Sequence, residues 1–302
     1  MTISSFRPRR PSEEAVTGWL VVTPWIVGFL IFMVWPLTAS VYFSLTKYNV
    51  VSSPVWVGLD NYRRILSDDP KFAQSIVNTL IYAAIFVPLH LFMALGTALL
   101  LHRARHLKGI FRTVYYLPSI TPAIATAYVW ILILNPNEGI VNRALRALHL
   151  PAPGWTVDPF WTKPTIVISQ LWLVGSAMVI FLAGLKGISK SLYEAATLDG
   201  AGAVRRFRDV TLPMLSGVTF FIITVDLINS LQVFAQGYVM FDKNGGPNGA
   251  GLFAVMYLFK RAFEYFQMGY ASAIAWLLFL MILAVTLGQF WLAKRWVYVE
   301  AD

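Results

Sequence analysis

Six long runs without charged residues constrain this chain more than any other feature of its sequence. The runs cover residues 15–46, 72–102, 113–137, 164–185, 210–241 and 265–293. Together they contain one charged side chain, that of Asp226. A helix that crosses a bilayer needs about 20 apolar residues, and a soluble core has no use for six segments of that length. We therefore expect an all-α membrane protein with six transmembrane helices.

The runs also divide the chain. We expect an N-terminal tail over residues 1–17, a first transmembrane helix with its external loop over 18–71, a five-helix core over 72–295 and a C-terminal tail over 296–302. The first run is at least twice as long as the apolar part of a cleaved signal peptide, which spans about 7–15 residues, so we expect it to be retained. Prolines interrupt several runs, which is tolerated where neighbouring helices or water satisfy the freed carbonyl groups. This pattern is typical of a bundle packed around a cavity.

Composition excludes several classes of function. The chain has no cysteine, which excludes disulfides and thiolate-bound metals. Its net charge of +9 is spread over the connecting loops, whereas nucleic-acid binding needs a clustered basic face. No Gly-x-x-x-x-Gly-Lys-Ser/Thr loop is present, so we expect no ATP site in this chain.

The sequence offers no catalytic or metal-binding constellation. Membrane enzymes need paired carboxylates, a Ser/His pair or several histidines within the bilayer, whereas the middle of the runs supplies only Asp226 and His90. His102 and His106 lie four residues apart and could bind a metal, but the arginines beside them favour two interfacial residues at a helix end. We therefore expect neither a catalytic nor a metal site.

Basic residues indicate the orientation in the membrane. If the N-terminus is cytoplasmic, six crossings return the C-terminus to the same side, and 14 of the 24 Lys and Arg residues fall on cytoplasmic segments. Arg7, Arg105, Arg205 and Lys294 are among them. Cytoplasmic loops of membrane proteins carry an excess of basic residues, so both termini are expected in the cytoplasm.

The most informative segment, residues 191–213, joins the fourth and fifth runs. Ser191, with Glu194 three residues later, has the spacing of a capping box at a helix N-terminus. The two alanines that follow favour helix and leave a smooth surface. Gly200 permits a sharp turn at the end of this helix, and Pro213 can open the next one. The segment predicts a short helix outside the membrane, shaped to dock onto another protein.

This segment resembles the EAA loop of the transmembrane subunits of binding-protein-dependent ABC importers. The elements of that loop, Glu-Ala-Ala, Asp-Gly-Ala and Leu-Pro, stand here at residues 194–196, 199–201 and 212–213, at the family's spacing. Further motifs resemble the MalF/UgpA-type permease subunit of type I ABC sugar importers. They include Gly58–Tyr62, Asn78–Leu80, Leu117–Pro118, Gly139 with Asn142, and Gly245–Pro247.

The resemblance implies a type-1 ABC transmembrane domain whose EAA loop forms a cytoplasmic coupling helix. The positions that it carries over for coupling are Glu194, Ala195, Ala196, Asp199 and Gly200. As partners it implies a second, MalG-type permease subunit, two ATPase subunits that bind ATP and Mg, and an extracytoplasmic solute-binding protein, in a bacterial inner membrane. The chain itself would hold no cofactor. From the residues alone, the alternative is a capped amphipathic connector with no docking role.

The substrate class that the resemblance implies is a carbohydrate, with glycerol-3-phosphate or a glycerophosphodiester as the alternative. The uncharged runs contain no Lys or Arg, which favours a neutral sugar in the part of the pathway that this chain supplies. A secondary transporter or channel would instead show inverted repeats or ladders of intramembrane ion pairs, and the sequence shows neither pattern.

A polar stripe on the predicted fifth helix indicates where the substrate passes. Asp226, Asn229, Gln232 and Gln236 fall within an arc of about 120° at helical periodicity. An ionised Asp at mid-bilayer costs about 2.5–3.5 kcal/mol, so it must face a cavity or a partner. The resemblance places nine residues on the pathway, namely Ser169, Trp172, Leu173, Ser176, Asp226, Asn229, Ser230, Gln232 and Val233. The alternative is that the stripe binds one helix to another.

Overall fold

The computed structural model describes residues 13–104 and 108–298. The outer parts of the two expected tails, with Arg7, and also Arg105 and His106, lie outside these ranges. The described residues are mostly helical. The α-helices are α1 (Glu13–Phe29), α2 (Trp35–Ser44), α3 (Asp60–Asp68), α4 (Pro70–Arg103), α5 (Lys108–Tyr116), α6 (Ala123–Ile133), α7 (Ile140–Ala147), α8 (Pro159–Leu171), α9 (Gly175–Gly187), α10 (Lys190–Leu198), α11 (Ala203–Arg206), α12 (Leu212–Met214), α13 (Ser216–Leu231), α14 (Ala235–Phe241), α15 (Ala254–Phe259) and α16 (Met268–Ala293).

Short elements connect these helices. Two-residue strands, β1 (Thr46–Lys47) and β2 (Val55–Trp56), pair antiparallel. Single π-helical turns cover Leu30–Val34, Phe207–Thr211 and Lys260–Glu264, and 3₁₀ turns cover Leu117–Ile120 and Pro247–Gly249. The first π-helical turn joins α1 and α2 into one continuous helix.

The six uncharged runs correspond to the apolar helices of the structure. Three helices, Thr17–Ser44, Pro70–Arg103 and Met268–Ala293, are each long and apolar enough to cross a bilayer. Three bent pairs bring the number to six if each pair crosses once. They are Lys108–Ile120 with Ala123–Ile133, Pro159–Leu171 with Gly175–Gly187, and Ala203–Met214 with Ser216–Leu231. The prediction of an all-α, six-helix membrane protein is confirmed.

Proline accounts for the sharpest bend, and a glycine permits a close helix contact at another. The pair α5–α6 turns through 103° at a 3₁₀ turn that contains Pro118 and ends before Pro122, where proline removes backbone donors. The pair α8–α9 turns through 52°. There a Cβ on Gly175 would lie 2.3 Å from the carbonyl oxygen of Tyr115, so only glycine lets α9 start this close to α5.

Helix α4 is the centre of the bundle and packs against α8, α9, α13 and α15. Two apolar clusters form along it. One contains Tyr82, Phe253 and Tyr257, and the other contains Ala94, Ala98 and Phe181. The two alanines are fully buried, and their small side chains let neighbouring backbones approach closely, as at other helix contacts in membranes.

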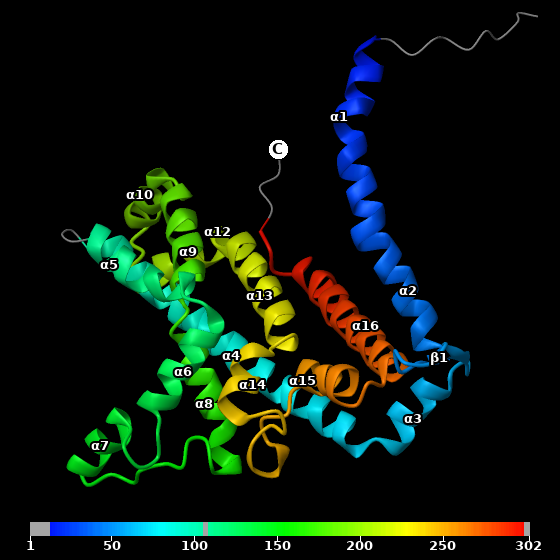
Figure 1. The fold of residues 1–302 in the computed structure, drawn as a ribbon. Coiled ribbons are helices and arrows are strands. Elements are labelled where there is room, and N and C mark those ends of the chain that lie inside the picture. The colour runs from blue at the N-terminus through cyan, green and yellow to red at the C-terminus, as the bar shows by residue number, and fades with distance from the viewer. Residues whose placement is uncertain (1–12, 105–107, 299–302) are drawn as a thin grey trace, which may run out of the picture.

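The ends of the molecule differ in what they carry. In Figure 1 the start of α1, the end of α16 and α10 lie at one end, and α3, β1 and α7 lie at the other. Helix α1 runs away from the bundle, and only its continuation α2 packs against α16. Trp19, Trp25 and Phe32 on this continuous helix are exposed, so this surface needs lipid or another chain to cover it.

Buried amides fasten the loops at the α3 end. Asn61 donates to the carbonyl oxygens of Ser44 and Thr46, both at 2.9 Å. Asn78 donates to those of Gly249 and Leu252 at 2.9 and 3.1 Å. Each amide thus satisfies two carbonyl groups at the end of a helix, strand or turn, where the regular hydrogen-bond pattern stops.

Asn142 fastens the loop between α6 and α8, and its replacement by alanine tests this role. Its amide donates to the carbonyls of Pro136 and Pro153, and its Oδ1 accepts from the indole of Trp155. Each buried group left unsatisfied costs about 1–3 kcal/mol, so Asn142→Ala should open the loop. We expect faster hydrogen exchange over residues 135–158. The control Asn137→Ala removes an exposed amide in the same loop, and equal exchange in the two variants would contradict this role.

Candidate functional site

Helix α10 forms where the EAA loop is predicted, but its N-cap differs from the prediction. The side chain of Ser189 accepts from the N–H of Ser191 at 3.3 Å. The prediction of Ser191 as N-cap is therefore wrong, and Glu194 lies too far into the helix for a capping box. The reason is local: Ser189 has the extended backbone of an N-cap residue (φ −62°, ψ 136°), whereas Ser191 is already helical.

The C-terminal end of α10 depends on Gly200. Its φ of +75° is left-handed, which costs other residues about 1–2 kcal/mol. The N–H of Gly200 bonds the carbonyl of Thr197 at 3.0 Å, and that of Ala201 bonds the carbonyl of Ala196 at 2.9 Å. These two bonds form a Schellman motif. The glycine thus turns the chain sharply after Leu198, where the helix ends.

The surface around this turn is open. Among the five predicted coupling positions, Glu194, Ala195, Asp199 and Gly200 are exposed and Ala196 is half-buried. Leu198 beside them is 89% exposed, and a Cβ on Gly200 would meet nothing within 4 Å. The exposed leucine and the uncovered turn at Gly200 together leave room for another protein to pack against this surface.

Two hydrogen bonds join α10 to the helical segment that follows it. The hydroxyls of Tyr193 and Thr211 lie 3.0 Å apart, and Arg206 donates to the hydroxyl of Thr197 at 3.0 Å. Arg206 ends α11, and Thr211 closes the π-helical turn that leads into α12 and α13. Helix α10 is therefore connected to α9 directly through the chain, and to the segment before α13 through these two bonds.

Between these helices and α4 lies a cavity of about 330 Å³. It lies where the two apolar clusters meet, because Tyr82 and Phe86 of the first and Ala177 and Ile222 of the second all line it. Five of the nine predicted pathway residues also line it: Leu173, Ser176, Asp226, Asn229 and Ser230.

The other four predicted pathway residues do not line this cavity. Ser169 is buried and donates to the carbonyl of Ile166 at 2.8 Å, and Val233 is buried in the first apolar cluster. Trp172 is partly exposed and packs edge-on against Trp130. Gln232 is exposed just after α13. Their roles in transport stay predictions.

The predicted polar stripe on a single fifth helix is wrong. Helix α13 ends at Leu231, and Gln236 belongs to the separate helix α14. Between them Phe234 has a non-helical backbone (φ −139°, ψ −68°). Helix α14 packs against α6 instead of continuing α13, so only Asp226 and Asn229 of the stripe share the cavity.

A buried contact between His90 and Asp226 spans the cavity wall. The imidazole Nδ1 lies 2.7 Å from Asp226 Oδ2, and both residues are buried. This contact joins α4 to α13, which fits the alternative that Asp226 binds helix to helix. Asp226 Oδ1 accepts no hydrogen bond from the described residues, so the same carboxylate keeps a free acceptor at the cavity.

Sequence reasoning missed three polar residues of the cavity wall, Tyr82, His90 and Gln170. The Oε1 atom of Gln170 is buried with no hydrogen-bond partner among the described residues. It could accept a hydrogen bond from a ligand hydroxyl. One signal was available for His90. A lone carboxylate in one run and a histidine in the middle of another are expected to pair, because ionisable groups within a membrane usually pair with one another.

The lining is suited to a hydroxylated, uncharged ligand. A carboxylate oxygen, two amides and three hydroxyls accept and donate hydrogen bonds, and aromatic rings cover part of the wall. No Lys or Arg lines the cavity. The described residues contain no group of three or more His, Asp or Glu side chains able to hold a metal ion.

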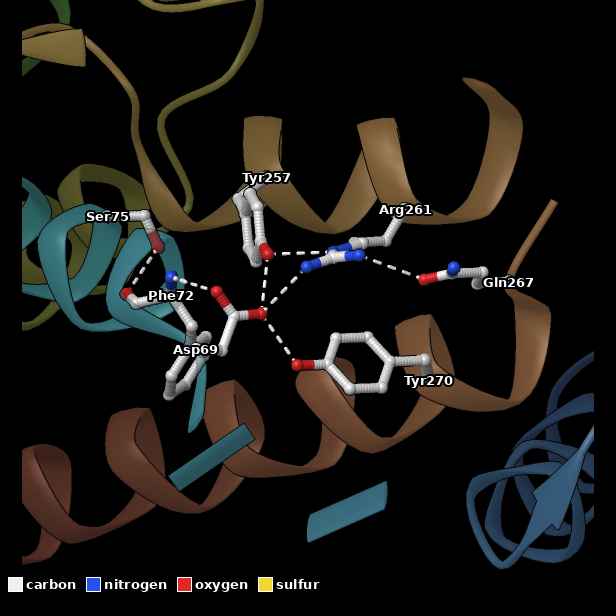
Figure 2. A network of polar contacts seen from close by, with 7 residues as sticks. All are labelled: Asp69, Phe72, Ser75, Tyr257, Arg261, Gln267 and Tyr270. Atoms are coloured by element: carbon white, nitrogen blue, oxygen red, sulfur yellow. Dashed lines mark hydrogen bonds and ion pairs between the residues drawn. The ribbon is translucent and has the colours of Figure 1, made fainter. Parts of the chain in front are cut away.

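Asp69, the N-cap of α4, organises a second polar region near α3 (Figure 2). Its Oδ2 accepts from the hydroxyls of Tyr257 at 2.5 Å and Tyr270 at 2.6 Å and from Arg261 at 3.0 Å. Its Oδ1 accepts from the N–H of Phe72 at 3.1 Å. Burial alone would raise the pKa of Asp69, but these bonds together lower it below its usual value. Burial and the bond to Asp69 raise the pKa of Tyr257, which keeps its hydroxyl a donor.

The lowered pKa predicts how the stability conferred by Asp69 changes with pH. A carboxyl whose pKa is depressed on folding stabilises the protein above its unfolded pKa of about 3.9, and this stability is lost as the pH falls through the lower folded pKa. Asp69→Asn should therefore lower the melting temperature of the purified protein by the same amount from pH 8 to pH 5. Below about pH 4 the difference from wild type should shrink. A difference that grows on acidification would contradict this assignment.

Comparisons with known proteins agree with this architecture. Residues 87–298 match the sequence family described as "Binding-protein-dependent transport system inner membrane component". The chain is 38% identical over 297 residues to the probable ABC transporter permease protein YesP of Bacillus subtilis, covering 98% of this chain and 96% of that protein. It is 32% identical to the lactose transport system permease protein LacF of Rhizobium radiobacter, covering 93% of this chain and 95% of that protein.

A solved structure has the same fold. It is a bacterial ABC transporter involved in the import of the acidic polysaccharide alginate. One of its chains superposes with a TM-score of 0.81 at 22% sequence identity, covering 94% of this chain and 98% of that chain. At this identity the similarity concerns the fold alone.

Proposed function

We infer the function of this chain from its family. The chain belongs to the binding-protein-dependent transport system inner membrane components, and within them it is a permease of a type I ABC sugar importer. Such a permease is a multi-pass, non-catalytic membrane subunit, and it implies ATPase subunits and a solute-binding protein as partners. We propose further that the chain forms half of the translocation pathway and that a MalG-type permease forms the other half. Two ATPase subunits would bind the ATP and Mg, and both termini would be cytoplasmic.

The observation that carries this proposal is the position of the cavity. It lies between α4, α9 and α13, and α9 and α13 are the helices on either side of α10. A partner that displaces α10 would therefore move two walls of the cavity against the third. Alternating access requires such a coupling between a cytoplasmic surface and a cavity within the membrane.

We propose that Glu194, Ala195, Ala196, Asp199 and Gly200 form the surface that the ATPase contacts. Their exposure and the left-handed turn at Gly200 support this proposal. The bonds Tyr193–Thr211 and Arg206–Thr197 would transmit closure of the ATPases to the base of α13.

We propose a carbohydrate as the substrate. Relatives named for lactose, for arabinooligosaccharides and for trehalose/maltose are 29–32% identical to this chain. Glycerol-3-phosphate or a glycerophosphodiester is the second candidate, but the cavity has a carboxylate and no Lys or Arg in its lining. An anionic ester would therefore need its charge satisfied by the partner permease.

The function is tested by reconstitution. The chain, co-expressed with its expected partners, is inserted into proteoliposomes, and uptake of labelled sugars is followed with and without ATP and the solute-binding protein. The proposal requires uptake that depends on both. A chain that purifies alone and moves solute without ATP would contradict it.

A further inference from the structure

A second and larger cavity lies beside the Asp69 network, whose side chains Figure 2 shows. Its volume is about 700 Å³, which falls in the range of about 300–1,000 Å³ found for small-ligand sites. Six charged side chains line it. Four are cationic, namely Arg64, Lys71, Lys260 and Arg261, and two are anionic, namely Asp68 and Asp69. The wall is therefore positive on balance.

Lys260 is the unusual member of this group. It is only 8% exposed, and its ammonium donates to Oδ1 of Asn244 and lies 5.7 Å from the centre of the Tyr265 ring. No carboxylate of the described residues lies within 4.0 Å of its nitrogen. A buried ammonium has three donors and is costly to desolvate unless an anion pairs with it.

The carboxylates of the wall leave this charge unbalanced. Asp69 already accepts four hydrogen bonds, one of them from Arg261, so its charge and its acceptor sites are used. Asp68 is exposed to solvent and makes no ion pair with a described residue. Arg64 lies 5.7 Å from the centre of the Tyr270 ring and also has no carboxylate partner among the described residues.

The backbone holds Lys260 firmly in this position. It opens the π-helical turn Lys260–Glu264, a conformation found frequently at functional sites. Arg261, the next residue, is fixed by bonds to Asp69, Tyr257 and Gln267 (Figure 2). A cation on so fixed a segment is preorganised, and a ligand would not have to order it first.

We propose that this cavity is a binding site for an oxyanion group, a phosphate or a carboxylate, with Lys260 as its central ligand and Arg64 at its rim. A soluble small molecule or the headgroup of an anionic phospholipid can supply this chemistry. The site is distinct from the cavity at Asp226 and does not depend on the identity of the transported substrate.

The experiment uses the intact transporter complex in nanodiscs and separates the two sources. In the first arm the discs contain only phosphatidylcholine, and inorganic phosphate or galacturonate is added, with galactose as the uncharged comparison. In the second arm no soluble anion is added, and phosphatidylglycerol replaces part of the lipid. Melting temperature and calorimetric binding are measured in both arms for wild type, Lys260→Met, Arg64→Met and Lys243→Met.

The matched control is Lys243→Met, because Lys243 pairs with Glu264 at 3.7 Å and does not line the cavity. We expect saturable stabilisation of wild type and of Lys243→Met by an anion in at least one arm. Truncating a charged partner of a buried ligand leaves the ligand's charge unpaired, so Lys260→Met should weaken binding at least about tenfold, and Arg64→Met should weaken it less.

Each outcome decides the proposal. Stabilisation in the first arm assigns a soluble anion, and stabilisation in the second assigns a lipid headgroup. Equal shifts with galactose and galacturonate, no response in either arm, or unchanged binding in both Lys260→Met and Arg64→Met would overturn it. Lys260→Met should fold, because it removes a buried charge and leaves no counter-ion behind. Its melting temperature without anion reports on this directly.

Discussion

Replacing Gly200 by aspartate is expected to leave the permease inserted in the membrane while uncoupling it from the ATPase. Gly200 has left-handed φ at the end of α10, and a side chain there would extend into open space on this chain. In a complex, that space would be filled by the partner. Burying an unpaired carboxylate costs several kcal/mol, and each 1.4 kcal/mol changes an affinity about tenfold. Substrate-stimulated ATP hydrolysis should therefore fall at least about tenfold.

Gly200→Asn is the matched control for this substitution. Asparagine has the size of aspartate and tolerates the left-handed conformation equally well, but it carries no charge. We expect Gly200→Asn to keep part of the stimulated hydrolysis, whereas Gly200→Asp should lose nearly all of it. The measurement is ATPase activity of the reconstituted complex with and without loaded solute-binding protein, together with co-purification of the ATPase. Normal stimulation in Gly200→Asp would contradict the coupling role of α10.

The features that the sequence predicted correctly depend on local properties. Six uncharged runs predict six membrane-spanning segments, because the length and apolarity of a segment decide whether it can enter a bilayer. The helix α10 and its glycine turn were also predictable, because the Schellman motif at Gly200 needs only five or six neighbouring residues. Its N-cap was not, since Ser189 and Ser191 are chemically equal and only the backbone distinguishes them.

Several motif residues of the family resemblance have a structural role that the sequence could not show. Asn61, Asn78 and Asn142 each donate two hydrogen bonds to backbone carbonyls. The partners of Asn78 lie 171 and 174 residues away in the chain. Every residue has a backbone carbonyl group, so the sequence does not indicate which carbonyl an asparagine will contact. These hydrogen bonds can be identified only from the folded structure.

The break after α13 explains why the polar stripe failed as a prediction. Residues 226–236 contain neither proline nor glycine, so their periodicity continues without a sign of interruption. The helix ends because α14 packs against α6, which is a tertiary effect. For the same reason Tyr82 and Gln170, on α4 and α8, could not be assigned to a cavity whose other wall is α13.

Replacing Asp226 by alanine is expected to reduce sugar uptake sharply while the complex still assembles. The carboxylate lines the cavity with one oxygen free of hydrogen bonds from the described residues. Hydrogen bonds to a charged group contribute about 1.5–3 kcal/mol, so losing one to a sugar hydroxyl should lower uptake about 10- to 100-fold. Uptake and substrate-stimulated hydrolysis are measured in proteoliposomes, and basal ATP hydrolysis should stay near normal.

The contact with His90 offers a way to separate substrate binding from helix packing. Asp226→Ala leaves the buried imidazole without its partner, which itself costs about 1–3 kcal/mol. The double variant His90→Leu/Asp226→Leu removes both polar groups, and replacing both partners of a buried bond by apolar groups can be nearly neutral for stability. If Asp226 only joins α13 to α4, the double variant should recover assembly and uptake together.

If the carboxylate binds the sugar, assembly and thermal stability should recover in the double variant while uptake stays low. The reason is that no apolar side chain can accept a hydrogen bond from the sugar hydroxyl. His90→Leu alone then separates the two roles further, since it keeps the carboxylate at the cavity and should retain more uptake than either Asp226 variant.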